Sequence, residues 1–422
     1  MSMEYIDIVI LGGGIAGLGA ALKARELGRQ AVIFEARDSA GGLLDNFTVD
    51  GFRFDHAVHL SFASEPEVRA IFDSTPYLTH PADSYCWDNG YWLKHPVQNN
   101  LFPLPPEERV ALIKSFLARP NVLAGDDYDS WLRHQYGDAI AERYPLRYTV
   151  KYWAVPASHL STEWVGNRMR RAELDEILFG ALTGDTPNTY YTKEMRYPRE
   201  GGYKAFIEPL IAQSDIRTGH RVTSIDTTSR TVHFANGRQV AYGTLVSTLP
   251  LPVLVQLVAD APGEVREAGT RLHATSIDLV SVGFDKPIVK DLWFYIYDED
   301  ILAARAYSPS VKSPDNAPPG CSSLQFEIYN YGTGTAHDAE KLKDNTVYAL
   351  GKMGIAQPGD IVVLDHRRLP YGNVIFERGM EAHRATVRDW AAGAGIATCG
   401  RFGEWDYLWS NQSLLSGYRA IA

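Results

Sequence analysis

The first sixty residues of this 422-residue chain constrain its fold more than any other segment. Residues 5–11 (YIDIVIL) form a short apolar run that is typical of a buried β-strand. Residues 15–27 are rich in alanine and leucine and predict a helix, and residues 30–35 (QAVIFE) predict a second strand. The turn between the first strand and the helix has the spacing Gly-x-Gly-x-x-Gly. These elements, in this order, predict a unit that binds a dinucleotide.

The glycines of this turn have separate physical roles. Gly12 permits the tight turn, Gly14 lets backbone N–H groups approach a pyrophosphate, and Gly17 lets the helix pack closely on the strand. The pyrophosphate would lie at the helix N-terminus, where unpaired N–H groups and the helix dipole favour negative charge. Glu35 follows about 20 residues beyond the turn and can accept hydrogen bonds from a ribose hydroxyl.

Composition excludes several other classes of protein. The net charge is −10 and the isoelectric point is about 5.7, so no basic field favours nucleic acid or anionic lipid. Cys86, Cys321 and Cys399 have no Cys-x-x-Cys spacing, and they imply neither a disulfide framework nor a metal site. The low-charge run at residues 6–22 carries Asp7 and is broken by glycines, so we expect neither a transmembrane segment nor a signal sequence. We therefore expect a cytoplasmic protein.

The remaining chain gives coarser predictions of secondary structure. Predicted helices cover residues 105–131, 138–152 and 377–394, and predicted strands lie within residues 218–249 and 277–297. Asn236-Gly237 is a hairpin-turn signal between two strands. The proline-rich segments 96–106 and 308–321 are expected to be loops. Aromatic residues are dense between Tyr144 and Tyr203, which favours either core packing or a ligand cleft lined with rings.

Three further segments resemble the signature of one family of FAD-dependent proteins. Gly41-Gly42 is followed by residues 51–59 (GFRFDHAVH). Val222 stands in a strand that leads to residues 245–250 (LVSTLP), and Gly400-Arg401 lies near the C-terminus. On these segments the chain resembles the family that contains amine oxidases, protoporphyrinogen oxidases and UDP-galactopyranose mutases. The resemblance implies an α/β fold, in which a Rossmann-like FAD-binding domain of the glutathione-reductase-2 type is interleaved with an α+β substrate domain.

The resemblance also implies FAD, bound non-covalently, as the cofactor. The surroundings of Cys399 do not match the branch of the family that tethers its flavin. His59 would lie on the loop over the flavin face, although a lone histidine is also often a structural hydrogen bonder. The expected cofactor-binding residues are Gly12, Gly14, Ile15, Ala16, Gly17, Glu35, Ala36, Arg37, Gly41, Gly42, Leu43, His59, Val222, Gly400, Arg401, Asn411, Gln412 and Ser413.

The middle of the chain resembles the UDP-galactopyranose mutases within this family. Residues 148–153 (YTVKYW), the basic residues Arg168 and Arg170, and residues 197–203 (YPREGGY) follow the mutase order and spacing. The implied substrate-binding residues are Trp153, Trp164, Arg168, Tyr191, Arg305 and Tyr371, and the implied catalytic residues are His59, Arg168, Arg305 and Tyr371. For each arginine a surface ion pair is the alternative, and for the tyrosines and tryptophans the alternative is ordinary core packing.

Three functions are open at this point. The first is a mutase-like flavoenzyme, in which N5 of reduced flavin is the nucleophile and a nucleotide sugar interconverts between pyranose and furanose. The second is an oxidoreductase of the amine oxidase or protoporphyrinogen oxidase type, which transfers hydride to oxidised flavin. The third is a non-enzymatic module like the GTPase dissociation inhibitors, which the intact glycine turn and Gly400-Arg401 disfavour. Leu43-Leu44 and Ser410-Asn411 depart from the mutase pattern, and the loop at 308–320 looks more like oxidoreductase relatives.

The positions of the motifs predict two interleaved domains with a ligand cleft between them. The FAD-binding domain is expected at residues 1–80, 201–262 and 391–422. A helical and substrate-domain insert is expected at residues 81–200, and a substrate domain with an antiparallel sheet at residues 263–390. We expect a small-molecule substrate, in the first place a nucleotide sugar, and no nucleic-acid partner or bound metal. The sequence leaves open whether the protein forms a homodimer.

Overall fold

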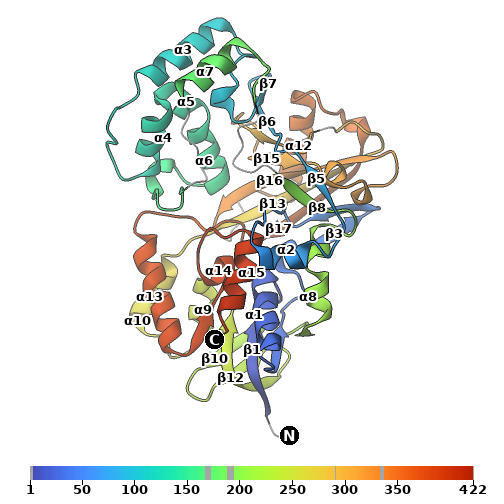
Figure 1. The fold of residues 1–422 in the computed structure, drawn as a ribbon, viewed down its shortest axis with the longest axis vertical. Coiled ribbons are helices and arrows are strands. Elements are labelled where there is room, and N and C mark those ends of the chain that lie inside the picture. The colour runs from blue at the N-terminus through green and yellow to red at the C-terminus, as the bar shows by residue number, and fades with distance from the viewer. Residues whose placement is uncertain (1–2, 167–172, 188–193, 290, 333–336, 422) are drawn as a thin grey trace.

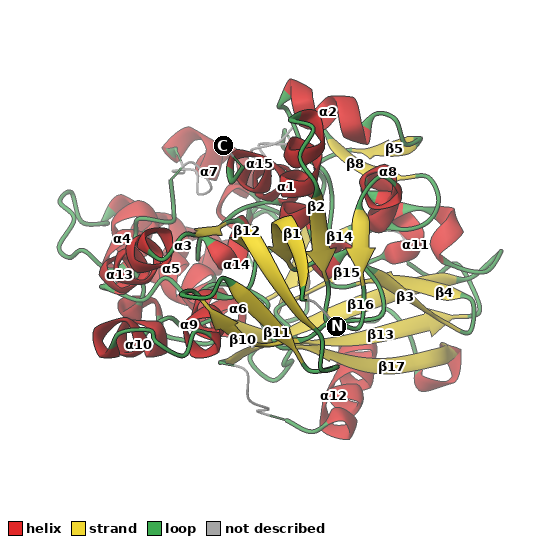
Figure 2. Cartoon of the chain, turned by 90° about the horizontal axis from the view of Figure 1, so that it is seen from below, coloured by secondary structure: helices red, strands yellow, loops and turns green. Residues whose placement is uncertain are grey.

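The computed structural model of the protein describes residues 3–166, 173–187, 194–289, 291–332 and 337–421. These residues form two seven-stranded sheets, two two-stranded sheets and the helices that cover them. Figure 1 shows the first sheet and its helices at the end of the molecule near both termini, and a group of helices at the opposite end. Figure 2 shows that the strands of the second sheet run in a different direction from those of the first.

The first sheet contains the predicted dinucleotide-binding unit. Its strand order is β10-β11-β12-β1-β2-β9, and β18 pairs with β12. The strands are β1 Glu4–Leu11, β2 Ala31–Phe34, β9 Asp215–Arg217, β10 Val222–Asp226, β11 Thr231–Phe234, β12 Gln239–Ser247 and β18 Ile396–Thr398. β12, β1, β2 and β9 are parallel, whereas β11 pairs antiparallel with β12, and β10 pairs antiparallel with β11. Ile8, Val9 and Ile10 of β1 are fully buried, as expected for a strand covered on both faces.

Two helices that are distant in sequence pack on each other beside this sheet. α1 (Ile15–Glu26) follows the glycine turn, and α15 (Ser410–Arg419) lies against it. A Cβ added at Gly19 would lie 2.2 Å from a backbone carbonyl oxygen of α15. A Cβ added at Gly417 would lie 1.8 Å from a backbone carbonyl oxygen of α1. Glycine at both positions therefore lets the C-terminal segment approach the N-terminal unit.

The second sheet is mostly antiparallel and has the strand order β17-β13-β16-β15-β14-β6-β7. Its strands are β6 Tyr85–Asp88, β7 Tyr91–Lys94, β13 Thr275–Phe284, β14 Trp293–Ile296, β15 Arg305–Tyr307, β16 Ser322–Tyr331 and β17 Ile361–Leu369. β14 and β6 form a parallel pair, which makes the sheet mixed. The two small sheets are the hairpin of β3 Asn46–Val49 with β4 Phe52–Asp55, and the antiparallel pair of β5 Tyr77–His80 with β8 Met195–Pro198, which are distant in sequence.

The remaining helices cover the sheets or form the helical end of the molecule. They are α2 Pro66–Phe72, α3 Pro106–Leu117, α4 Tyr128–Tyr136, α5 Asp138–Arg143, α6 Pro145–Trp153, α7 Leu174–Leu182, α8 Glu208–Ala212, α9 Leu251–Leu257, α10 Gly263–Thr270, α11 Pro309–Lys312, α12 Ala339–Lys352, α13 Met380–Gly393 and α14 Gly400–Gly403. Short 3-10 turns are η1 Gly42–Leu44, η2 Val97–Asn99, η3 Ala157–His159, η4 Tyr203–Phe206, η5 Pro314–Asn316 and η6 Pro358–Asp360. α3 to α7 gather at the end away from the termini (Figure 1).

Several sequence-based boundaries were wrong. The helix predicted at 105–131 is two helices, because the segment between α3 and α4 contains Pro120 and Gly125, which interrupt a helix. The helix predicted at 138–152 is also divided, since proline at 145 disfavours helical backbone at the residue before it. The loop predicted at 308–321 contains α11 and η5.

The predicted fold class is confirmed by the parallel Rossmann-like sheet and the mixed second sheet. Segments 1–80, 201–262 and 391–422 supply the strands of the first sheet, while 81–200 and 263–390 supply those of the second. We keep the division into two interleaved domains as a proposal on this basis. No helix in the described part of the chain is long and apolar enough to cross a membrane. The described residues also contain no group of three or more His, Cys, Asp or Glu arranged to hold a metal ion.

Candidate active site

A cavity of about 780 Å³ has walls that come from both sheets. One end is formed by the glycine turn after β1, by Glu35 after β2 and by Thr248 after β12. The other end is formed by side chains of β14, β15 and β16 and by the loop that precedes α2. Ligands of open α/β sheets bind at the carboxyl ends of the parallel strands, and the cavity opens at that edge of the first sheet.

The glycine turn leaves room for a ligand at the N-terminus of α1. Gly12 has a φ of +104°, and a Cβ there would lie 2.1 Å from Thr248 Oγ1, so the position accepts only glycine. Gly14 is the N-cap of α1, and no side chain caps the first N–H groups of the helix. These N–H groups and the helix dipole are therefore available to an anionic ligand.

Glu35 holds the turn and also faces the cavity. Its carboxylate accepts hydrogen bonds from Gly13 N at 2.8 Å and from Arg37 N at 2.9 Å. The residue is only 7% exposed, and it lines the cavity beside Gly12 and Gly14. A carboxylate has about four acceptor sites, so capacity remains for ribose hydroxyls. A turn without side chains, a free helix N-terminus and a buried carboxylate fit the adenosine diphosphate half of FAD.

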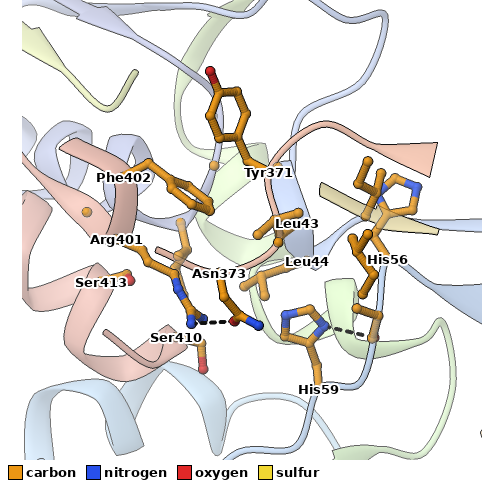
Figure 3. Close-up of a pocket in the computed structure, with 18 of the residues that line it drawn as sticks. Leu43, Leu44, His56, His59, Tyr371, Asn373, Arg401, Phe402, Ser410 and Ser413 are labelled. Carbon is orange, nitrogen blue, oxygen red and sulfur yellow. Dashed lines mark hydrogen bonds between the residues drawn. The ribbon is translucent and has the colours of Figure 1, made fainter. Parts of the chain in front are cut away.

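Arg401 and Asn373 form a polar pair in the cavity wall (Figure 3). Arg401 Nη2 donates to Asn373 Oδ1 at 2.9 Å, and the guanidinium lies 4.6 Å from the ring centroid of Tyr407. Arg401 Nε and Asn373 Nδ2 are buried donors that have no hydrogen-bond partner among the described residues. Buried polar groups are normally paired, so these donors fit a ligand rich in acceptors, as FAD is.

His59 is a neutral imidazole in the same wall. A ring nitrogen, Nδ1, lies 3.1 Å from the carbonyl oxygen of Ala57. Because a carbonyl can only accept, Nδ1 carries the proton and Nε2 is left as an acceptor. Burial lowers the pKa of His59 to about 4, against the smaller opposing effect of the Asp55 carboxylate. His59 therefore accepts a hydrogen bond at neutral pH and has no charge to contribute.

Asp55, which belongs to the segment at 51–59, has a structural role behind this loop. Its carboxylate accepts from Lys312 Nζ at 3.1 Å and from Tyr197 OH at 2.8 Å. Both side chains of the Asp55–Lys312 pair are completely buried. The pair therefore joins the hairpin β3–β4 to α11 and fixes the loop that carries His59.

The buried carboxylate of Glu327 holds Arg305, one of the predicted substrate-binding residues. Arg305 Nε donates to Glu327 Oε2, and Arg305 Nη2 donates to Tyr329 OH at 3.0 Å. Glu327 is 0% exposed, and its other oxygen accepts from Val58 N at 2.7 Å. Glu327 therefore links Arg305 on β15 to the loop that carries His59. Arg305 Nη1 has no acceptor among the described residues.

The structure brings most of the predicted cofactor-binding residues to the cavity. These are Gly12, Gly14, Ile15, Ala16, Glu35, Ala36, Arg37, Gly41, Gly42, Leu43, His59, Gly400, Arg401 and Ser413. Arg305 and Tyr371 also line it. Both groups come together although they are spread over nearly the whole chain.

Four predicted cofactor-binding residues lie outside the described lining. Gly17 instead packs α1 on β1, since a Cβ there would lie 2.1 Å from a backbone oxygen of the turn. Val222 is replaced in the lining by its neighbour Arg221. Asn411 donates its amide N–H to Glu65, and Gln412 caps α15 by accepting from the backbone.

The predicted substrate-binding tryptophans lie in the core. Trp153 is 3% exposed and Trp164 is 9% exposed, and their ring centroids are 4.9 Å apart. Neither belongs to the described lining of the cavity. Arg168 and Tyr191, together with Arg170 of the quoted pattern, lie outside the described residues.

Sequence reasoning missed several residues of the wall and the Glu327 carboxylate behind it. Asn373 lies two positions after Tyr371, and Tyr152 belongs to the quoted segment 148–153. Glu327 had a usable signal, because it is a carboxylate within the otherwise uncharged strand β16. A charged residue inside a buried strand normally has an ionic partner.

Comparisons with known proteins agree with the predicted family and fold. A family model, "Flavin containing amine oxidoreductase", matches residues 15–420. The structure is similar to a crystal structure of reduced UDP-galactopyranose mutase, with a TM-score of 0.91 and 25% identity, over 100% of this chain and 93% of that one. It also shares its fold with a double mutant of putrescine oxidase, with a TM-score of 0.69 and 16% identity, over 99% and 98% of the chains.

Curated sequence relatives match over shorter segments. All-trans-retinol 13,14-reductase of Danio rerio is 30% identical over 114 residues, which are 26% of this chain and 18% of the reductase. The chain thus spans less than a quarter of the length of such relatives.

Proposed function

This chain belongs to the flavin-containing amine oxidoreductase family and is a flavin-dependent enzyme, and we propose that it acts on a nucleotide sugar in the manner of a UDP-galactopyranose mutase. Two findings support the substrate class. The TM-score to the mutase is 0.91, against 0.69 to the putrescine oxidase variant. The cavity also places a guanidinium and several tyrosine hydroxyls in one wall.

The cofactor would be FAD, held without a covalent bond. Gly12, Gly14 and the N-terminus of α1 would hold the pyrophosphate, Glu35 the ribose, and Arg401 an acceptor atom of the cofactor. Cys399 is 1% exposed and lies outside the described lining, and burial raises the pKa of its thiol to about 12. It is therefore a poor nucleophile for a covalent tether. Reduced flavin, when bound, would supply an electron pair at N5 for attack on the anomeric carbon.

The observation that carries the proposal is Arg305 in the wall of the same cavity as the glycine turn. Glu327 and Tyr329 hold its Nε and Nη2, which leaves Nη1 for a ligand. A guanidinium in fixed orientation is suited to a diphosphate, because it donates charge-assisted hydrogen bonds and stays protonated. Arg305 would therefore bind the diphosphate as it develops charge on leaving the sugar.

Tyrosine hydroxyls would add neutral donors around this diphosphate. Burial raises the pKa of Tyr152 and Tyr371, so both remain protonated and can donate, whereas the hydroxyl of Tyr329 already donates to Glu327 at 2.7 Å. Tyr152 OH lies 3.1 Å from Tyr407 OH, and the two hydroxyls form a short chain toward Asn373. A bound diphosphate would accept from such hydroxyls without a further charged partner.

A hydride-transferring oxidoreductase is the second candidate, and one observation favours it. The Glu327 carboxylate already neutralises Arg305, and Trp293, Tyr295 and Phe62 add an apolar surface to the wall. A neutralised guanidinium beside apolar rings suits an amine or a porphyrinogen-like substrate better than it suits a dianion.

One anaerobic experiment separates the two candidates. Acid precipitation first tests whether FAD is released free in solution. The protein is then incubated with dithionite and a panel of nucleotide sugars, and separately, in its oxidised form, with a panel of amines and porphyrinogens. The proposal predicts an isomer of unchanged mass with the first panel and no bleaching with the second. Bleaching by a member of the second panel, without isomerisation in the first, would replace the mutase by the oxidoreductase.

A further inference from the structure

We propose that Asn373 is a specificity-determining residue, whose side-chain amide donates a hydrogen bond to an acceptor atom of the molecule bound in the cavity. Asn373 lies between β17 and α13, lines the cavity and is 4% exposed. The inference rests on the proposed function only in requiring a flavin or a nucleotide ligand in this cavity. The acceptor belongs to one of these two molecules, and the experiment below distinguishes them.

Hydrogen bonds to Thr275 of β13 hold both the N–H and the carbonyl group of Asn373. Thr275 N donates to the Asn373 carbonyl at 2.8 Å, and Asn373 N donates to Thr275 Oγ1 at 2.9 Å. Gly372, the preceding residue, donates its N–H to the Thr275 carbonyl at 2.6 Å. Thr275 itself is completely buried. The side chain of Asn373 therefore starts from a fixed point of the wall.

The orientation of the amide follows from its neighbours. Arg401 Nη2 lies 2.9 Å from Oδ1, and Tyr152 OH lies 3.5 Å from the same oxygen. A guanidinium carries donors only, so the atom of Asn373 that faces it must be the oxygen. A flipped amide would bring its NH₂ group against the guanidinium. Nδ2 consequently points away from Arg401, as Figure 3 shows.

This fixed Nδ2 has no acceptor within the described part of the chain. A buried N–H group without a partner is unfavourable, and native structures pair nearly all of them. Arg401 Nε, in the same wall, is a second buried donor without a partner. Two such donors in one wall suit an acceptor-rich group, such as a flavin carbonyl edge, a phosphate or a sugar oxygen.

An aspartate at this position would form different hydrogen bonds. Its carboxylate would pair with Arg401 and present no donor to the cavity, because an ionised carboxylate only accepts. The amide thus keeps the contact with Arg401 and adds a donor. This combination selects for a ligand with an acceptor at this point of the wall.

The test uses two variants that both lose the NH₂ donor but differ in charge and in the remaining oxygen. Asn373→Asp retains an oxygen for Arg401 but adds a charge, whereas Asn373→Leu is neutral and has neither oxygen nor donor. An effect shared by both variants is due to the lost donor. Asn100→Asp is the matched control, because Asn100 is 6% exposed, outside the described lining, and donates its amide to Pro96 O. FAD binding is measured by fluorescence titration of flavin-free protein, and UDP binding by calorimetry of FAD-saturated protein.

We expect both variants to weaken one of the two ligands about tenfold, and Asn100→Asp to weaken neither. Weaker FAD binding with unchanged UDP binding would place the acceptor on the flavin. Weaker UDP binding with unchanged FAD binding would place it on the nucleotide. Unchanged affinities, an effect in Asn373→Asp alone, or equal weakening of both ligands would overturn the inference. Wild-type protein that binds neither FAD nor UDP would overturn the proposed function as well.

Discussion

The two ends of the cavity are built from different parts of the polypeptide. The end at the glycine turn presents mainly backbone, namely the N–H groups at the start of α1 and the peptide surface around Gly12 and Gly14. The opposite end presents side chains of β15 and β16, held by Glu327. A site made of backbone depends on local spacing, whereas a site made of side chains depends on strand pairing between distant segments.

This difference separates the effects of mutation. Changes at the backbone end are expected to alter binding of the dinucleotide, while changes at the side-chain end are expected to alter binding of the second ligand. Glu327 connects Arg305 to the loop of His59, so both parts of the side-chain end depend on one carboxylate. The following substitutions test how far the separation holds.

The largest effect is expected from Gly14→Val at the backbone end. The backbone of Gly14 has φ −79° and ψ 178°, which valine adopts easily, and a Cβ would lie 3.7 Å from the nearest atom. The protein itself should therefore fold, while the side chain fills the space for the pyrophosphate. We expect FAD affinity to fall by about a hundredfold or more in fluorescence titration.

The control for this variant is Gly393→Val on α13, where a Cβ would meet no atom within 4 Å. It should leave FAD affinity unchanged. The melting temperature of flavin-free Gly14→Val should fall by no more than about 3 °C. Normal FAD binding by Gly14→Val would show that the pyrophosphate lies elsewhere.

At the side-chain end, removal of Arg305 should weaken UDP binding and spare FAD. Arg305→Ala alone would leave Glu327 buried and unpaired, which typically costs about 3–5 kcal/mol. The double variant Arg305→Ala/Glu327→Gln removes both charges and keeps an oxygen for Val58 N. We expect UDP affinity to fall by about thirtyfold or more in calorimetry, with FAD affinity within threefold of wild type. Unchanged UDP affinity would favour the oxidoreductase.

The same contrast explains how much of the molecule could be predicted from sequence. The glycine turn and Glu35 were predicted residue by residue, because their function depends on spacing within one βαβ unit. Glu327 and Asn373 were missed, since their roles arise only when β16 pairs with β15 and when the loop after β17 meets β13. The two long helices predicted within residues 105–152 were wrong for a local reason. Pro120, Gly125 and Pro145 interrupt the helical backbone although the hydrophobic pattern continues past them.

A smaller effect is expected from the pH dependence of His59. Its folded pKa of about 4 lies below the ordinary value of 6.5, so the unfolded chain takes up a proton first as the pH falls. The stability contribution is therefore present above about pH 6.5 and is lost progressively toward pH 4. Between pH 6.5 and 5 this amounts to about 2 kcal/mol at most.

The measurement compares urea unfolding of flavin-free wild type and His59→Gln at pH 7 and pH 5. The variant should lose less stability than wild type between these values, because glutamine does not titrate. His95, whose pKa burial also lowers to about 4, contributes equally to both proteins and cancels in the difference. Identical losses in the two proteins would mean that His59 titrates normally.

The smallest effect on UDP affinity is expected from substitution of Trp164. This substitution tests how far the side-chain end of the cavity extends into the neighbouring aromatic residues. Trp164 and Trp293 are 9% and 6% exposed, but only Trp293 belongs to the described lining of the cavity. Trp164→Phe should lower the free energy of unfolding by about 1–2 kcal/mol and leave UDP affinity within twofold. Trp293→Phe, the matched change in the wall, should cost similar stability and also weaken UDP binding by about fivefold. A tenfold loss of UDP binding in Trp164→Phe would extend the site into the aromatic cluster, and would restore the sequence-based expectation that Trp164 binds the substrate.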